Sequence, residues 1–217
     1  MKKKLLLGAG VLVVGLLAFF GRDLIGLYRL LAHIEATTEA YEAVGPWPQL
    51  ADACFGCHGD KGSSQHQRYP SLAAQPAAYL STQLERFAQG QRSYPNMGPL
   101  AMTLSAQEID WLASYYASQP AQANQAFEPD PALRERGAAL AASGACAACH
   151  GQALMGQAHF PRLAGQGADY LLAQLDAFAQ GRRIDPSGSM QAVTATLSPA
   201  DRKALSHYLA ALAPTAK

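Results

Sequence analysis

Cys54-Phe55-Gly56-Cys57-His58 and Cys146-Ala147-Ala148-Cys149-His150 decide the fold of this 217-residue chain. Both stretches follow the pattern Cys-x-x-Cys-His, the attachment signature of a c-type haem. Two thiols at this spacing can join the two vinyl groups of the porphyrin, while the adjacent histidine reaches the iron. The sequence therefore predicts two covalently bound haem c groups, held by Cys54, Cys57, His58, Cys146, Cys149 and His150.

Two other kinds of site use cysteines at this spacing. A redox-active dithiol would be expected within alternating strands and helices, whereas the surroundings here have helical periodicity throughout. A zinc site built from all four cysteines would leave the identical place of the two histidines unexplained. The motifs consume every cysteine of the chain, so no thiol remains for a disulfide or a nucleophile.

The chain beyond Gly45 contains the same sequence pattern twice. Pro70-Ser-Leu-Ala-Ala-Gln75 corresponds to Pro161-Arg-Leu-Ala-Gly-Gln166, 91 residues later, and Leu104-Ser105 corresponds to Leu197-Ser198, 93 residues later. We therefore predict an all-α protein with two tandem domains of one fold, at residues 45–118 and 131–217, joined by a polar linker at 119–130.

Helix signals recur at matching places in the two domains. We expect helices at 77–89 and 168–180, each closed by a glycine, and final helices that open at Ser105 and Ser198 with a capping-box acid three residues later. A helix at 131–142 leads into the second motif. Pro46 and Pro48 restrict its counterpart in the first domain to a turn or a short start.

The amino terminus predicts a membrane anchor. Three lysines precede seventeen uncharged residues, Leu5 to Gly21, and this order places everything that follows outside the cytoplasm. Because no small-x-small cleavage site follows, we expect one helix from about Lys3 to Glu42, with residues 1–44 as a transmembrane anchor and its extension. A cleaved signal peptide is the alternative. The expected location is the bacterial inner membrane, crossed once, with the haem domains in the periplasm.

The sixth iron ligand is predicted from the repeat. Met97 lies seven residues before Leu104, and Met190 lies seven before Leu197, in loops between helices. Met102 and Met155 have no methionine at their corresponding positions. His66 and His159 are the rival ligands, but they follow closely after the histidine already on the iron. We therefore expect iron bound by His58 and Met97 in one domain and by His150 and Met190 in the other.

Further paired residues are candidates for contacts with the haems. The carbonyls of Pro70 and Pro161 could accept a hydrogen bond from the ligand histidines, which would fix their tautomer. Arg92 and Arg183 could pair with haem propionates. A larger set of aromatic side chains is expected to pack against the porphyrins: Tyr79, Phe87, Tyr170 and Phe178.

Together these motifs resemble the dihaem cytochrome c4 family over about residues 45–212. The resemblance implies two class I cytochrome c folds, each with histidine and methionine ligands, that pass electrons between respiratory complexes in the periplasm. The chain departs from the family pattern in the prolines before the first motif and in an amino-terminal segment that looks retained, as in a membrane-anchored variant.

The expected function is electron transfer from a quinol-oxidising cytochrome bc complex to a terminal haem-copper oxidase. No acid, base or nucleophile set indicates an enzyme, and nothing indicates a nucleic acid or a small-molecule substrate. One alternative is a fixed haem subunit of a larger oxidase or dehydrogenase. A dihaem peroxidase or thiosulfate-oxidising enzyme is a weaker one, because these need an open iron position or a nonstandard ligand such as cysteine.

Overall fold

The computed structural model describes residues 2–42, 49–144 and 146–215. The chain divides into two compact units, residues 1–49 and 50–217. Every regular element among the described residues is a helix, apart from one isolated bridge between Gln157 and Phe160. The predicted all-α class is confirmed.

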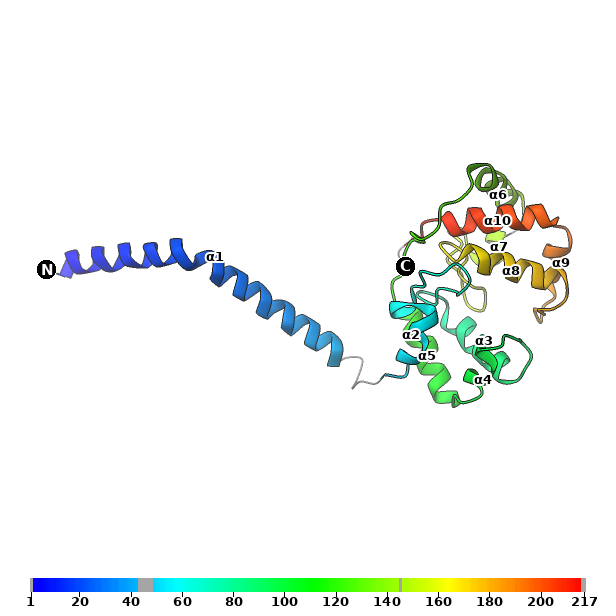
Figure 1. Cartoon of the computed structure of the whole chain (residues 1–217), viewed down its shortest axis with the longest axis horizontal. Helices are drawn as coiled ribbons and strands as arrows, with labels where there is room; N and C mark the ends of the chain where they lie inside the picture. The colour runs from blue at the N-terminus through cyan, green and yellow to red at the C-terminus, as the bar shows by residue number, and fades with distance from the viewer. Residues whose placement is uncertain (1, 43–48, 145, 216–217) are drawn as a thin grey trace. The chain divides into compact units, whose positions relative to one another are not determined.

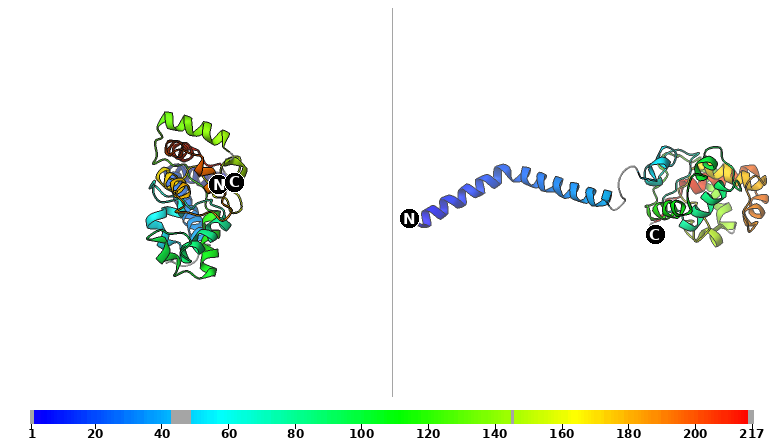
Figure 2. Two further views of the ribbon diagram at one scale, coloured as in Figure 1. Left: turned by 90° about the vertical axis from the view of Figure 1, so that its right-hand side faces the viewer. Right: turned by 90° about the horizontal axis from the view of Figure 1, so that it is seen from below.

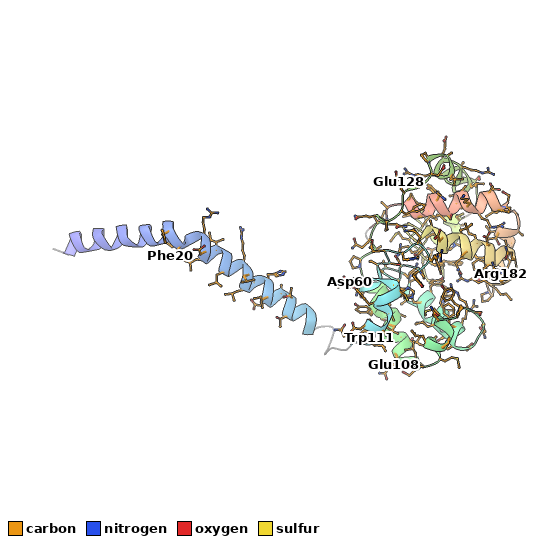
Figure 3. All side chains as sticks on the ribbon, viewed as in Figure 1. Phe20, Asp60, Glu108, Trp111, Glu128 and Arg182 are labelled. Atoms are coloured by element: carbon orange, nitrogen blue, oxygen red, sulfur yellow. The ribbon has the colours of Figure 1, made fainter. Side chains whose placement is uncertain are left out.

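The first unit contains a single long helix, α1 (Lys2–Glu42), close to the predicted bounds. It bends near Phe20 (Figures 1 and 3). In the part of the chain that the structure describes, no helix reaches the combined length and apolarity of a membrane-crossing segment. Pro46 and Pro48, with the break predicted there, lie outside the described residues.

The second unit begins with the first cytochrome-like domain. Its elements are α2 (Asp52–His58), the short 3-10 helix η1 (Asp60–Gly62), α3 (Ala77–Ala88), α4 (Met97–Ala101) and α5 (Ala106–Ser118). Helix α3 packs against α4 and α5. The core is formed by Ala51, Leu80, Leu112, Ala113 and Tyr116.

The second domain has helices in the same order as α2, α3, α4 and α5, and among the described residues they are preceded by a further helix. Its elements are α6 (Pro131–Ser143), α7 (Cys146–His150), α8 (Ala168–Ala179), α9 (Ser189–Ala195) and α10 (Pro199–Ala211). Helix α10 packs against both α6 and α8, and two views show α6 crossing over α10 (Figures 1 and 2). Gly137 permits this approach, because a Cβ atom there would clash with the carbonyl of Ala204.

The predicted helix ends are confirmed. Ser105 and Ser198 each form a complete capping box, with Glu108 and Asp201 respectively. Glu108 is labelled in Figure 3. Gly90 and Gly181 follow α3 and α8 with φ of 69° and 68°, a left-handed conformation that glycine adopts without a Cβ penalty. These turns direct the chain toward the segments that carry the candidate methionines.

Candidate haem sites

The two motif histidines end short helices and lie buried inside the second unit. His58 ends α2 and His150 ends α7, and both are less than one-tenth exposed. The Nδ1 of His58 lies 2.7 Å from the carbonyl oxygen of Pro70, and that of His150 lies 2.8 Å from the carbonyl of Pro161. Since a carbonyl only accepts, Nδ1 donates its proton and Nε2 is left for a metal. The sequence predicted both hydrogen bonds.

Burial also favours the neutral form of both imidazoles. It lowers the pKa of His58 and of His150 below the ordinary value, and the carbonyl hydrogen bonds oppose this only in part. Burial likewise raises the pKa of the Cys54 and Cys146 thiols. Across the described residues, no group of three or more His, Cys, Asp or Glu side chains could hold a bare metal ion.

Both motifs face one cavity of about 810 Å³. Its wall includes both motif histidines and all four motif cysteines, together with Met97 and Met190. The four aromatic side chains expected to pack against porphyrin also line it: Tyr79, Phe87, Tyr170 and Phe178. A mostly apolar space shared by the two halves fits the flat apolar face of haem.

The surroundings of the methionines favour the predicted pair. Met97 and Met190 are half-buried on the cavity wall. Met102 is 70% exposed, and Met155 is part of the apolar core of the second domain. The expectation that both ligands sit in loops is wrong in detail, because Met97 begins α4 and Met190 lies in the first turn of α9.

The rival histidines are exposed. His66 accepts a hydrogen bond at Nδ1 from the amide of Arg68, and its ring packs beside Tyr69. His159 reaches the edge of the cavity but is also exposed. Neither has the buried, carbonyl-anchored setting of His58 and His150, so methionine remains the preferred sixth ligand.

Arg92 and Arg183 form a crossed contact between the two domains. Arg92 donates to Gln83 of its own domain at 2.9 Å and to Tyr170 and Gln174 of the other at 3.1 Å each. Arg183 mirrors it, and its partners are Gln174 at 2.7 Å, Tyr79 at 3.2 Å and Gln83 at 3.0 Å. Each guanidinium also lies 4.6 Å from the ring centre of a phenylalanine, Phe87 or Phe178.

This arrangement brings two cations to the cavity wall among neutral hydrogen-bond acceptors. Burial by itself would raise the pKa of Tyr170, but the positive charges of Arg92 and Arg183 outweigh it and lower that pKa below its ordinary value. Such a positive region would attract carboxylates. It fits the predicted contact with haem propionates, and both arginines also hydrogen-bond to side chains of the chain itself.

Arg162 provides a separate test of whether the residues fit haem. It is 1% exposed, lines the cavity, and donates from Nε to the Ala73 carbonyl and from Nη1 to the Ala164 carbonyl. Its Nη2 is buried without a hydrogen-bond partner, and burial lowers the pKa of Arg162 to about 10. A buried guanidinium with a spare donor is stabilised by an anionic acceptor, and a haem propionate would provide one.

Sequence reasoning missed the role of Arg162 and of four glutamines at the domain contact: Gln75, Gln83, Gln166 and Gln174. The glutamines recur at matching places in the repeat, a signal that could have identified them. Arg162 gave no such signal, because the corresponding residue is Ser71.

Comparison with protein families finds a cytochrome c model over residues 134–213 and a model of cbb3-type cytochrome c oxidase subunit III over residues 47–115. Together with the two motifs, they identify two haem c groups as the cofactors of the chain. Each domain therefore matches a cytochrome c family on its own.

Relatives match across both domains. The chain is 39% identical to cytochrome c4 of Thiocapsa roseopersicina over 81% of its length and 99% of the relative's. It is 38% identical to a thiosulfate dehydrogenase electron acceptor of Stutzerimonas stutzeri strain A1501, over 86% and 93%. The structure of reduced cytochrome c4 from Pseudomonas stutzeri matches at 33% identity with a TM-score of 0.70, covering 75% of this chain and 94% of that chain.

Proposed function

The chain belongs to the dihaem cytochrome c4 family, and we propose that it carries electrons in the periplasm from a quinol-oxidising cytochrome bc complex to a terminal haem-copper oxidase. The cytochrome c4 relatives are electron carriers, and the chain is accordingly an electron-transfer protein and not an enzyme. Haem c supplies reversible one-electron chemistry. The chain's own residues hold the two haems, anchor their histidines and exclude water from them.

The observation that carries the proposal is the single cavity shared by two equivalent sites. His58 and His150 face it from opposite halves of one compact unit, and Arg92 and Arg183 link those halves by direct hydrogen bonds. Because both sites lie in one compact unit and line one cavity, an electron accepted at one can pass to the second without a docking step. Such internal transfer suits a carrier that accepts an electron from one partner and delivers it to another.

Charge supports a directional encounter with two partners. Residues 45–120 carry four basic and five acidic side chains, whereas residues 131–217 carry eight basic and five acidic ones. Arg162 and Arg202 of the second half are buried, so the exposed charge of the two halves differs less than these totals, and this smaller difference is what would steer oppositely charged partners to different halves.

We also propose that the chain is anchored in the bacterial inner membrane by its amino terminus. The support is the uncharged run from Leu5 to Gly21 behind three lysines. Sodium carbonate washing of membranes should leave the full-length protein in the pellet and release a variant that lacks residues 2–21 and is exported with a cleavable signal. Release of the full-length protein, or a mature mass without residues 1–44, would refute the anchor.

A second candidate follows from two relatives. Thiosulfate dehydrogenase electron acceptors from Thiomonas intermedia and Stutzerimonas stutzeri are 35% and 38% identical to the chain. In this case the donor would be a thiosulfate dehydrogenase rather than a bc complex. A fixed haem subunit of a larger complex is the other alternative, and it would co-purify in a constant ratio through detergent.

Stopped-flow spectroscopy on the detergent-solubilised holoprotein distinguishes these donors. We expect rapid haem reduction by quinol with a bc complex and rapid reoxidation by a haem-copper oxidase, with both rates falling as salt rises. Reduction by thiosulfate with a thiosulfate dehydrogenase, and none by the bc complex, would replace the proposed donor with the second candidate.

A further inference from the structure

The peptide bond between Pro70 and Ser71 makes hydrogen bonds at both ends. Its carbonyl oxygen accepts the Nδ1 proton of His58, and its N–H, on Ser71, donates to Oε1 of Gln166 at 2.7 Å. Gln166 belongs to the other domain. A continuous hydrogen-bonded path thus runs from the ligand histidine of the first domain to a glutamine of the second.

The peptide bond between Pro161 and Arg162 is the mirror image. Its carbonyl accepts from His150, and its N–H donates to Oε1 of Gln75 in the first domain at 2.8 Å. Each glutamine also returns a hydrogen bond from Nε2. Gln75 donates to the Arg162 carbonyl at 3.0 Å, and Gln166 donates to the Ser71 carbonyl at 2.9 Å. Both amides are therefore held at two points.

We propose that Gln75 and Gln166 are positioning residues that set the reduction potential of the haem in the opposite domain. When the N–H of a peptide group donates a hydrogen bond, its carbonyl oxygen becomes a stronger acceptor, because hydrogen bonds in a chain polarise one another. A stronger acceptor draws on the Nδ1 proton and makes the imidazole a more basic ligand. A more basic ligand stabilises oxidised iron, so an intact path lowers the potential.

Burial makes this polarisation effective. Gln75 is 3% exposed and Gln166 is 2% exposed. Water, which would otherwise supply an alternative acceptor to the amide, is kept away, and the low local dielectric strengthens each hydrogen bond. The proposal depends only on the two haem c sites and not on the choice of redox partner.

The two hydrogen-bonded paths differ in how many N–H groups the glutamine oxygen accepts. Oε1 of Gln166 also accepts the N–H of Gly167 at 3.0 Å, whereas the corresponding residue after Gln75 is Pro76, which has no N–H to donate. An oxygen shared between two donors polarises each of them less. The path from Gln75 to His150 should therefore be the stronger one.

The test is an optical redox titration of the full-length holoprotein and its variants. NMR of the reduced protein, with ¹⁵N-labelled histidine, assigns the two haems. We expect Gln75→Leu to raise the potential of the His150 haem, shifting its oxidation equilibrium by about two- to tenfold. Gln166→Leu should do the same to the His58 haem with a smaller shift. In each variant the Nδ1 proton of the affected histidine, and not that of the other, should move upfield.

Gln67→Leu is the matched control. Gln67 also crosses the domain contact, since its Oε1 accepts from Ala168 at 3.0 Å, but it touches neither proline peptide. It should leave both Nδ1 resonances in place. Gln75→Glu and Gln166→Glu keep an acceptor oxygen and cover the case in which leucine prevents folding. They should leave the opposite haem's potential at or below that of the unmodified protein.

Two results would overturn the proposal. One is a shift confined to the haem in the same domain as the substituted glutamine. The other is an unchanged Nδ1 resonance in all four variants of Gln75 and Gln166. That result would mean that these two residues only pack at the domain contact. Neither result would touch the proposed electron-carrier function, which is tested by partner kinetics.

Discussion

The two cytochrome domains anchor their histidines in the same way but stabilise their folds differently. His58 and His150 have nearly identical carbonyl hydrogen bonds, 2.7 and 2.8 Å long. Around them, the second domain has helix α6 against α10 and two buried arginines, Arg162 and Arg202. The anchoring of the two histidines is thus the same, while the packing around them differs.

Replacing the sixth ligands should have the largest effect and should be equal in the two domains. Met97→Leu and Met190→Leu each remove one thioether from the cavity wall. Each should abolish about half the amplitude of the near-infrared sulfur-to-iron band of the oxidised protein, because one haem of two is affected. Near-infrared absorption checks this. Met102→Leu, at an exposed site, is the control, and a full band in either ligand variant would refute that assignment.

Replacing Arg162 in the second domain should lower the free energy of unfolding more than replacing its counterpart, Ser71, in the first. Arg162→Ser copies the residue of the first domain, and it leaves the carbonyls of Ala73 and Ala164 without their donor. We expect a loss of about 2–3 kcal/mol in the free energy of unfolding, from buried unpaired groups. Ser71→Ala removes only an acceptor for the Ser64 amide and should cost less than about 1 kcal/mol. Guanidinium unfolding of the holoprotein measures both, and equal losses would contradict the asymmetry.

The contact between α8 and α10 should depend on an ion pair that the contact between the fully described helices α3 and α5 does not have. Arg202 pairs with Asp176 at 2.6 Å, whereas the corresponding position in the first domain is the buried Ile109. Arg202→Ile should lower the free energy of unfolding by about 1–3 kcal/mol, because it leaves a partly buried carboxylate unpaired. The double variant with Asp176→Leu should recover most of that loss in the same unfolding experiment. No recovery would mean that Arg202 acts through packing alone.

The capping boxes should give the smallest effect. The Ser105 amide and hydroxyl hold the pKa of Glu108 below its usual value, and the Ser198 hydroxyl and Arg136 do the same for Asp201. A carboxyl with a lowered folded pKa contributes stability that is fully present above its ordinary pKa and is lost as pH falls through the lowered pKa of the folded state. Thermal unfolding at pH 7 and pH 3 should show a smaller drop for Asp201→Asn and for Glu108→Gln than for the unmodified protein. If the unfolding temperature of a variant fell as much between pH 7 and pH 3 as that of the unmodified protein, the capping boxes would not be the cause of the fall.

The sequence predicted those features that arise within one repeat. Gly90 and Gly181, the capping boxes, and the hydrogen bonds of Pro70 and Pro161 to the histidines all follow from local chemistry, and the structure confirms them. The starts of α4 and α9 were missed, since a helix of a single turn or two has too little apolar periodicity to be recognised.

Features that need both repeats could not be read from either one. Arg92 and Arg183 were expected to meet propionates, but their hydrogen bonds also cross to the opposite domain, a contact set by how the halves pair. Arg162 occupies a place that differs between the two repeats, and the sequence carried no expectation for it. Its buried guanidinium donates to the Ala73 carbonyl of the other domain, a contact that no local pattern records.

The crossed glutamine contacts have one more consequence. Each half contributes one glutamine side chain and one backbone segment to this contact. Gln75 makes two hydrogen bonds to the backbone of Arg162, and Gln166 makes two to the backbone of Ser71. In an isologous homodimer the two copies contact each other reciprocally, through the same surface of each copy. The contact between the two halves has this reciprocal pattern. One half alone thus has the groups needed to associate with its own copy, and the covalent connection through residues 119–130 turns such a pair into a permanent, monomeric assembly.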